Sequence, residues 1–173
     1  ITDIVNEGSA TNINWTITNA GNNKNFTLRA TGAMTEGTVI PSIPGGVIAA
    51  ADEEKTNTSS ISIDNTILYD TTPVGVVIDK SSPDPSVSLP IEFNIAFSEP
   101  VNLSSFSKSD IVIQGSATVT PDELINSGDN QNFTYRVLST SSLGDIDISI
   151  NAMALTDLAS NPNNSSTHLD NNI

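Results

Sequence analysis

Four residues carry side-chain oxygens at positions where they could bind a cation: Asp70, Glu99, Asp157 and Asn161. Glu99 follows one predicted strand, Asp157 and Asn161 follow another, and Asp70 precedes a third. If these strands alternate in direction, as in an antiparallel sandwich, all four side chains meet at one end of the fold. Calcium takes about six to eight oxygen ligands, so this set predicts a Ca²⁺ site. The alternative is that the Asp and Asn side chains only cap turns, with Glu99 solvated.

A second acidic group, Asp52, Glu53 and Glu54, lies in the first part of the chain. Adjacent like charges repel one another unless a cation compensates them. This group is therefore a second, weaker candidate for calcium. The alternative is a solvated acidic tip without a bound ion.

Residues for covalent or acid–base catalysis do not form a catalytic pattern in this sequence. The absence of cysteine removes disulfides, thiolate metal sites and a cysteine nucleophile. His168 is the single histidine and is expected on a strand surface, not as a base or ligand. Serine is frequent, but the sequence has neither a Gly-x-Ser-x-Gly motif nor a glycine-rich phosphate loop. We therefore expect a protein that is not an enzyme.

The charge balance excludes several partners. Lys and Arg total 6 against 20 Asp and Glu, which gives a formal net charge of −14. Binding to nucleic acid or to an anionic membrane surface depends on basic residues, so neither partner is expected. The longest apolar run, at 47–51, is much shorter than the roughly 20 residues that span a bilayer. Direct insertion into a membrane is therefore not expected either.

The chain repeats itself at an offset of 107 residues. From Asp3 to Arg29, 14 of 27 positions are identical to those 107 residues later. A fixed period of this kind indicates an array of structural units. At the offset of 107, DIVNEGSAT (3–11) matches DIVIQGSAT (110–118), and NAGNNKNFTLR (19–29) matches NSGDNQNFTYR (126–136). At an offset of 106, NTSSISIDNTI (57–67) matches NNSSTHLDNNI (163–173).

Alternation of apolar and polar residues predicts short β-strands throughout. Clusters of Asn, Gly, Ser and Pro separate them, which is typical of an all-β sandwich, with a closed β-barrel as the alternative. A short helical turn is expected only within 102–110. The predicted strands are 13–17, 25–30, 61–67, 74–78, 91–97 and 145–150.

The repeat also predicts the domain boundaries. Pro73 suits a linker that enters the first strand of a new unit, since it fixes φ and lacks an N–H group. We expect a complete unit at 70–173 and a partial unit at 1–69 that lacks its first strands. Such a unit would expose unpaired strand edges. Either those strands were cut away or another molecule supplies them.

Four segments in order resemble a known family: DTTPVGVVID, LPIEFNIAFSEPV, FSKSDIVIQGSATV and ALTDLASNPN. They are similar to the immunoglobulin-like repeats of large biofilm-associated surface adhesins of bacteria. The resemblance implies tandem immunoglobulin-like antiparallel β-sandwiches, with calcium stiffening the joints of a stalk. Two departures stand out: Ser160 lies where the family usually has glycine, and ADEEKTN (51–57) replaces the corresponding loop in the first unit.

The sequence thus predicts an extracellular structural segment, at the bacterial cell surface or secreted, that acts in cell adhesion and biofilm formation. Its expected partners are neighbouring repeats or copies of itself. Two other functions remain open. One is a filament subunit joined by donor-strand complementation. The other is a carbohydrate-binding module of a secreted enzyme, which would need a row of exposed aromatic residues.

Overall fold

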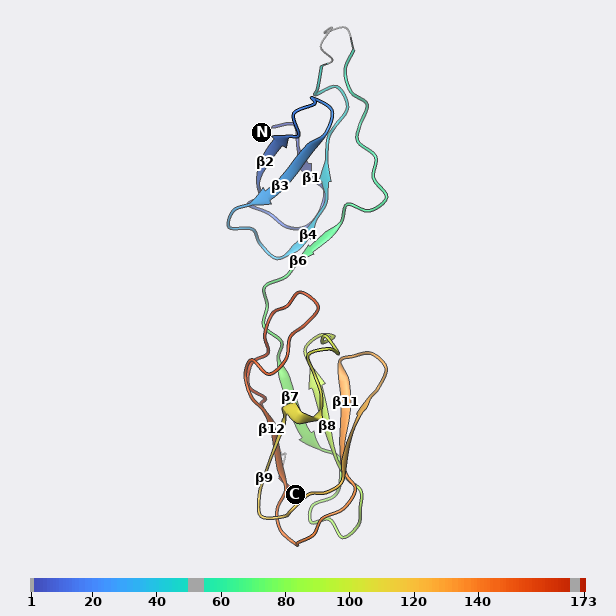
Figure 1. The fold of residues 1–173 in the computed structure, drawn as a ribbon, viewed down its shortest axis with the longest axis vertical. Helices are drawn as coiled ribbons and strands as arrows, with labels where there is room; N and C mark the ends of the chain where they lie inside the picture. Colours follow the sequence, from blue (N-terminus) through green and yellow to red (C-terminus); the bar gives the residue numbers. More distant parts are fainter. Residues whose placement is uncertain (1, 50–54, 169–171) are drawn as a thin grey trace. The chain divides into compact units, whose positions relative to one another are not determined.

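The computed structural model describes residues 2–49, 55–168 and 172–173, and in this part the chain is all-β with antiparallel sheets (Figure 1). Asp52, Glu53 and Glu54 lie outside the described residues. The chain divides into two compact units, Ile1–Thr71 and Thr72–Ile173, a boundary two residues beyond the predicted one. The described residues contain no helix with the length and apolar character of a membrane span.

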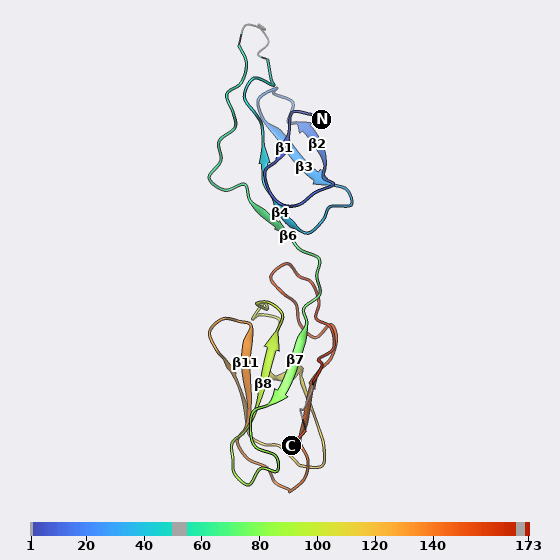
Figure 2. The same cartoon turned by 180° about the vertical axis from the view of Figure 1, so that it is seen from behind.

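The second unit has two antiparallel sheets in its described part. The larger sheet has the strand order β10–β11–β8–β7, and Figure 2 shows β11, β8 and β7 side by side. The smaller sheet pairs β12 with β9. The expected helical turn is confirmed as η1 (Lys108–Asp110). The strands are β7 (Val76–Lys80), β8 (Ile91–Phe97), β9 (Ile111–Gln114), β10 (Asp122–Asn126), β11 (Asn132–Val137) and β12 (Asp147–Ile150).

Alternation along the strands builds the core of the second unit. In β8, Phe93, Ile95 and Phe97 are buried, whereas the residues between them are not. In β11 the buried side chains include Phe133 and Tyr135. Side chains two residues apart point to the same face of a strand, so both strands turn one apolar face inward. Buried residues from both sheets form a single apolar cluster.

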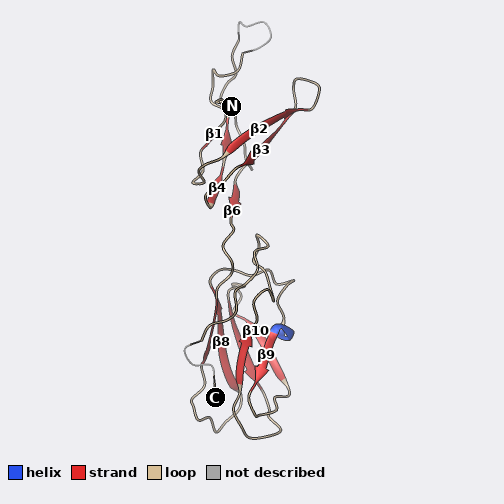
Figure 3. Cartoon of the chain, turned by 90° about the vertical axis from the view of Figure 1, so that its left-hand side faces the viewer, coloured by secondary structure: helices blue, strands red, loops and turns tan. Residues whose placement is uncertain are grey.

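The first unit has three two-stranded sheets in its described part, and Figure 3 shows the β2–β3 ribbon. The predicted strands at 13–17 and 25–30 are confirmed as β2 and β3. The predicted strand at 61–67 is wrong up to residue 66, because only Ile67 enters a strand. The strands are β1 (Val5–Asn6), β2 (Asn14–Asn19), β3 (Phe26–Thr31), β4 (Gly37–Val39), β5 (Pro41–Ser42) and β6 (Ile67–Tyr69).

Segments that match in sequence also have matching local structure. In the first unit, the Asn19 Oδ1 atom accepts the Gly21 N–H at 2.9 Å. In the second, the Asn126 Oδ1 atom accepts the Gly128 N–H, also at 2.9 Å. Both glycines have positive φ, which glycine adopts without strain. Strand registers agree as well: Val5↔Ser42 corresponds to Val112↔Ser149, and Ile17↔Leu28 corresponds to Leu124↔Tyr135.

Candidate metal site

Three of the four predicted ligands lie together. One carboxylate oxygen from each of Asp70, Glu99 and Asp157 lies within 4.8 Å of the other two. Calcium binds oxygen at about 2.3–2.6 Å, so two of its ligand atoms can be no more than about 5 Å apart. The spacing of the three oxygens therefore fits a shared cation.

Backbone hydrogen bonds fix the chain on both sides of Glu99, just after the end of β8. The Ser98 N–H donates to the Gly75 carbonyl at 2.9 Å, and the Val101 N–H donates to the Asn130 carbonyl at 2.8 Å. The short segment that carries Glu99 is therefore held against two neighbouring parts of the second unit.

Asp157 is the most deeply buried member of the group, with 1% of its surface exposed. Its backbone bridges to Val101, which connects the loop after β12 with the segment after β8. Asn161 orients its carboxylate: the Asn161 N–H donates to Oδ1 at 2.8 Å, and the Asn161 Nδ2 donates to Oδ2 at 2.9 Å. The structure thus brings Asn161 to Asp157, as expected, but as a hydrogen-bond donor. As a metal ligand, Asn161 would have to use its other amide atom, Oδ1.

Ser160 has a backbone conformation that glycine adopts more easily than serine. Its φ is 74°, in the left-handed region that costs residues with a side chain about 1–2 kcal/mol. The turn nevertheless forms, with the Ser160 N–H 3.4 Å from the Asp157 carbonyl. Ser160 therefore adds strain to a turn that forms nonetheless.

Sequence reasoning missed Asn163, which organises the loop that carries Asp157. Asn163 is buried; its Oδ1 accepts the N–H groups of Ala154 and Leu155 at 2.8 and 3.0 Å, and its Nδ2 donates to the Asn151 carbonyl at 2.8 Å. Asn57 satisfies two consecutive N–H groups and a carbonyl in the same way in the first unit. The match of NTSS (57–60) to NNSS (163–166) was the signal that could have identified it.

The donor set favours a hard cation. All the candidate ligands are oxygens, and calcium prefers oxygen ligands, whereas softer metals favour histidine or thiolate. Three carboxylates can supply up to about six oxygens, and backbone carbonyls or water can complete the coordination. A buried carboxylate such as Asp157 is stable only when its charge is compensated or hydrogen-bonded. The residues of this group therefore fit Ca²⁺ as a candidate set of ligands.

A separate polar network stabilises the same unit. The buried Tyr135 hydroxyl donates a hydrogen bond to Asp122, whose Oδ1 lies 2.7 Å from the Lys108 Nζ. The hydrogen bond from Lys108 is the main cause that lowers the pKa of Asp122, and the bond from Tyr135 adds to it. Burial is the main cause that raises the pKa of Tyr135. This network joins the start of β10 to β11 and has no evident chemical role beyond stability.

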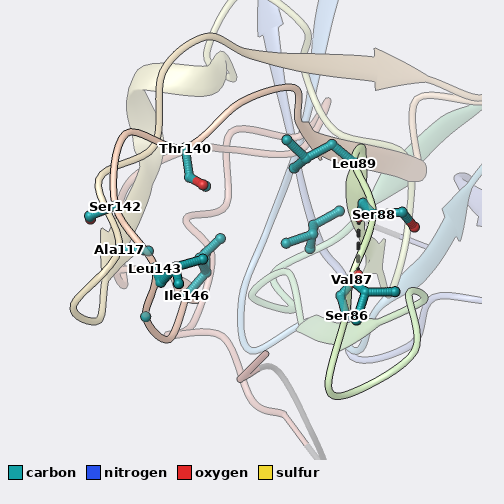
Figure 4. Close-up of a pocket in the computed structure, with 11 residues that line it drawn as sticks. Ser86, Val87, Ser88, Leu89, Ala117, Thr140, Ser142, Leu143 and Ile146 are labelled. Carbon is teal, nitrogen blue, oxygen red and sulfur yellow. Dashed lines mark hydrogen bonds between the residues drawn. The ribbon is translucent and has the colours of Figure 1, made fainter.

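Figure 4 shows a hollow of about 300 Å³ in the second unit. Its lining includes Ile91, the first residue of β8, whereas Glu99 follows the end of that strand. Its lining combines serine and threonine hydroxyls with apolar groups, including the almost fully exposed Val87 and Leu143. No acid, base or metal ligand lines it. His168, the single histidine, is exposed, and Trp15, the single tryptophan, is half-buried in β2.

Comparison with known proteins does not assign the chain to a family. A scan against protein-family models and searches of curated proteins and of solved structures found no match. The resemblance to adhesin repeats therefore remains a prediction from the sequence.

Proposed function

We propose that this chain is an extracellular structural segment of a bacterial adhesin or surface fibre, built from immunoglobulin-like β-sandwich repeats and stiffened by calcium. The acidic group of Asp70, Glu99 and Asp157 carries the proposal, because three carboxylates share a volume suited to one cation. The matching registers and turns of the two units support the repeat. The charge of −14 is consistent with a surface that gains stability from cations.

Calcium would act through the chain segment that enters the second unit. Asp70 lies four residues ahead of Val74, the first residue of that unit to be fully buried. A cation bound by Asp70 together with Glu99 and Asp157 would restrict the backbone between these positions. Restricting a linker in this way limits bending of a stalk, which is the mechanical role that we assign to the metal.

The test is thermal unfolding of the whole chain with calcium and with EDTA. At calcium concentrations near 100 times Kd, a site present only in the folded state adds about 2.7 kcal/mol. For a unit of this size, that corresponds to a rise in Tm of roughly 10–20 °C. The distribution of the chain's end-to-end distances, measured by small-angle scattering, should also become narrower when calcium is added.

Matched variants separate a specific site from general screening of charge. Glu99→Gln and Asp70→Asn should remove most of the calcium-dependent rise in Tm. Asp145→Asn, an equal change of charge at an exposed residue outside the group, should leave the rise intact. The calcium proposal fails if EDTA leaves Tm and scattering unchanged, or if all three variants respond to calcium alike.

A second candidate function is a filament subunit, in which a strand from a neighbouring molecule completes the first unit. The observation that favours it is the exposure of apolar residues on β2 and β3: Ile17 and Phe26 are both exposed although both belong to strands. Light scattering on the purified chain separates the two functions. Regular polymers would favour the filament, and a monomer would favour the stalk segment.

A further inference from the structure

The first unit has an open apolar face. A hollow of about 270 Å³ lies over β2 and β3. Phe26 is 56% exposed there, whereas Phe133, its equivalent 107 residues later, is 4% exposed. The apolar side chains that line the hollow are Ile4, Ile17, Phe26, Leu28, Ile43 and Ile48.

The second unit shows which strands lie beside the equivalent of β3. There β8 pairs with β11, with Phe133 opposite Ile95 and Tyr135 opposite Phe93. β7 then pairs with the other edge of β8. In the first unit, β3 is the equivalent of β11, and among the described residues it pairs only with β2. One edge of β3 is therefore open where the second unit has a two-stranded hairpin.

A second open edge lies where the other strand of that hairpin would fit. In the second unit, the Thr167 N–H donates to the Val76 carbonyl and the Ile78 N–H donates to the Thr167 carbonyl, both at 2.9 Å. Ile61 is the equivalent of Thr167. It is 97% exposed and enters no strand pairing within the described chain. Residues 61–66, where the predicted strand does not form, have no such partner in the described part of the chain.

The charge on the open edge of β3 also indicates that a strand like β8 would fit there. In the second unit, Arg136 of β11 forms an ion pair with Glu92 of β8, with the Nε and Oε1 atoms 2.7 Å apart. The equivalent residue in the first unit, Arg29, is exposed, and no ion pair of Arg29 occurs in the described part of the chain. A strand with a carboxylate opposite Arg29 would therefore complement this edge in charge as well as in shape.

We infer that the first unit is an acceptor for a β-hairpin of the β7–β8 kind, joined directly ahead of Asp3. One strand would pair with β3, with apolar residues opposite Phe26 and Leu28 and a carboxylate opposite Arg29. The other strand would pair with the segment around Ile61. We infer the covalent connection from the second unit. There, residues 98–109 connect β8 to Asp110, which is the equivalent of Asp3. A tethered hairpin also has a far higher effective concentration than a free one. This inference is independent of the calcium site.

The experiment compares the 173-residue chain with a version in which a copy of residues 72–109 replaces residues 1–2. Hydrogen exchange followed by mass spectrometry reports on the backbone of β3 and of residues 60–63. The copied hairpin should slow exchange in both segments by at least about tenfold, since both edges become hydrogen-bonded. It should also abolish binding of a hydrophobic dye to the first unit.

Variants within the copied hairpin provide matched controls. Phe93→Asp with Ile95→Asp, made only in the copy, should abolish the protection, because both side chains would face the apolar hollow. Asn94→Lys in the copy adds a charge on the opposite face of the same strand, across from Asp79, and should retain it. Arg29→Glu should weaken the protection, and Glu92→Arg in the copy should restore it. This charge exchange tests the register without depending on the apolar residues.

Three outcomes would overturn the inference. In the first, the copied hairpin leaves exchange in β3 unchanged. In the second, the double Asp variant protects β3 as well as the unaltered copy does. In the third, β3 is protected only when the hairpin is added as a free peptide, or when copies of the 173-residue chain assemble. That result would assign the acceptor to another molecule.

Discussion

Replacing the equivalent phenylalanines by alanine should have very different costs in the two units. Phe133 is almost completely buried, and its ring makes edge-to-face contacts with Phe97 and Phe106 at centroid distances of 5.6 and 5.1 Å. Removing a core phenylalanine costs about 3–5 kcal/mol, since the lost transfer energy is increased by the cavity. We expect about 4 kcal/mol for Phe133→Ala, or nearly a thousandfold change in the unfolding equilibrium.

The same substitution at Phe26 should cost much less. About half of this side chain is already in contact with water, and full burial of a phenylalanine is worth about 1.5–3 kcal/mol. The open face also leaves no closed cavity when the ring is removed. Phe26→Ala should therefore cost about 1 kcal/mol.

Urea unfolding measures both values. Amide NMR peaks report on each unit, and fluorescence of Trp15, the single tryptophan, reports on the first unit alone. The expected difference of about 3 kcal/mol is well above the uncertainty of linear extrapolation. Equal losses for the two variants would refute the reasoning, because they would mean that Phe26 is covered in solution. A larger loss at Phe26 would refute it more strongly.

Two further predictions concern the second unit. Ser160→Gly should raise the free energy of unfolding by up to about 1 kcal/mol, because glycine relieves the strain of a positive φ, whereas Ser165→Gly should lower it; chemical denaturation checks both. Tyr135→Phe should cost about 1.5–3 kcal/mol at pH 7 by removing a hydrogen bond to the charged Asp122. The lowered pKa of Asp122 means that its stabilising effect is complete above its ordinary pKa of 3.8. The effect is lost as the pH falls through the lowered value, so the cost of Tyr135→Phe should shrink in acid, and denaturation at several pH values measures this.

Local structure was largely predictable from the sequence, as the strands show. The alternation in residues 91–97 predicts β8, and clusters rich in Asn and Gly predict the turns that separate the strands. The identical residues at the offset of 107 predict equal turns, and the hydrogen bonds of Asn19 and Asn126 agree with this. These features depend on contacts between residues that are near one another in the chain, so a short stretch of sequence contains the necessary information.

The candidate site was only partly predictable. The order of antiparallel strands was enough to anticipate that Glu99 and Asp157 lie close together. It did not indicate that Asn161 would direct its amide N–H groups at the Asp157 carboxylate, or that Asn163 would hold the loop. These contacts depend on the path of a loop, which periodicity does not encode.

Burial is the property that only the tertiary structure decided. Phe26 and Phe133 are the same residue in the same local sequence, and both lie on a strand of the same register. Phe133 is buried because β8 lies beside β11 and the rings of Phe97 and Phe106 pack against it, whereas the structure describes no strand in the equivalent place beside β3. Alternation determines which side chains share a face of a strand. Whether that face is buried depends on a partner strand that is distant in the sequence. The residues of the strand itself do not indicate whether such a partner is present.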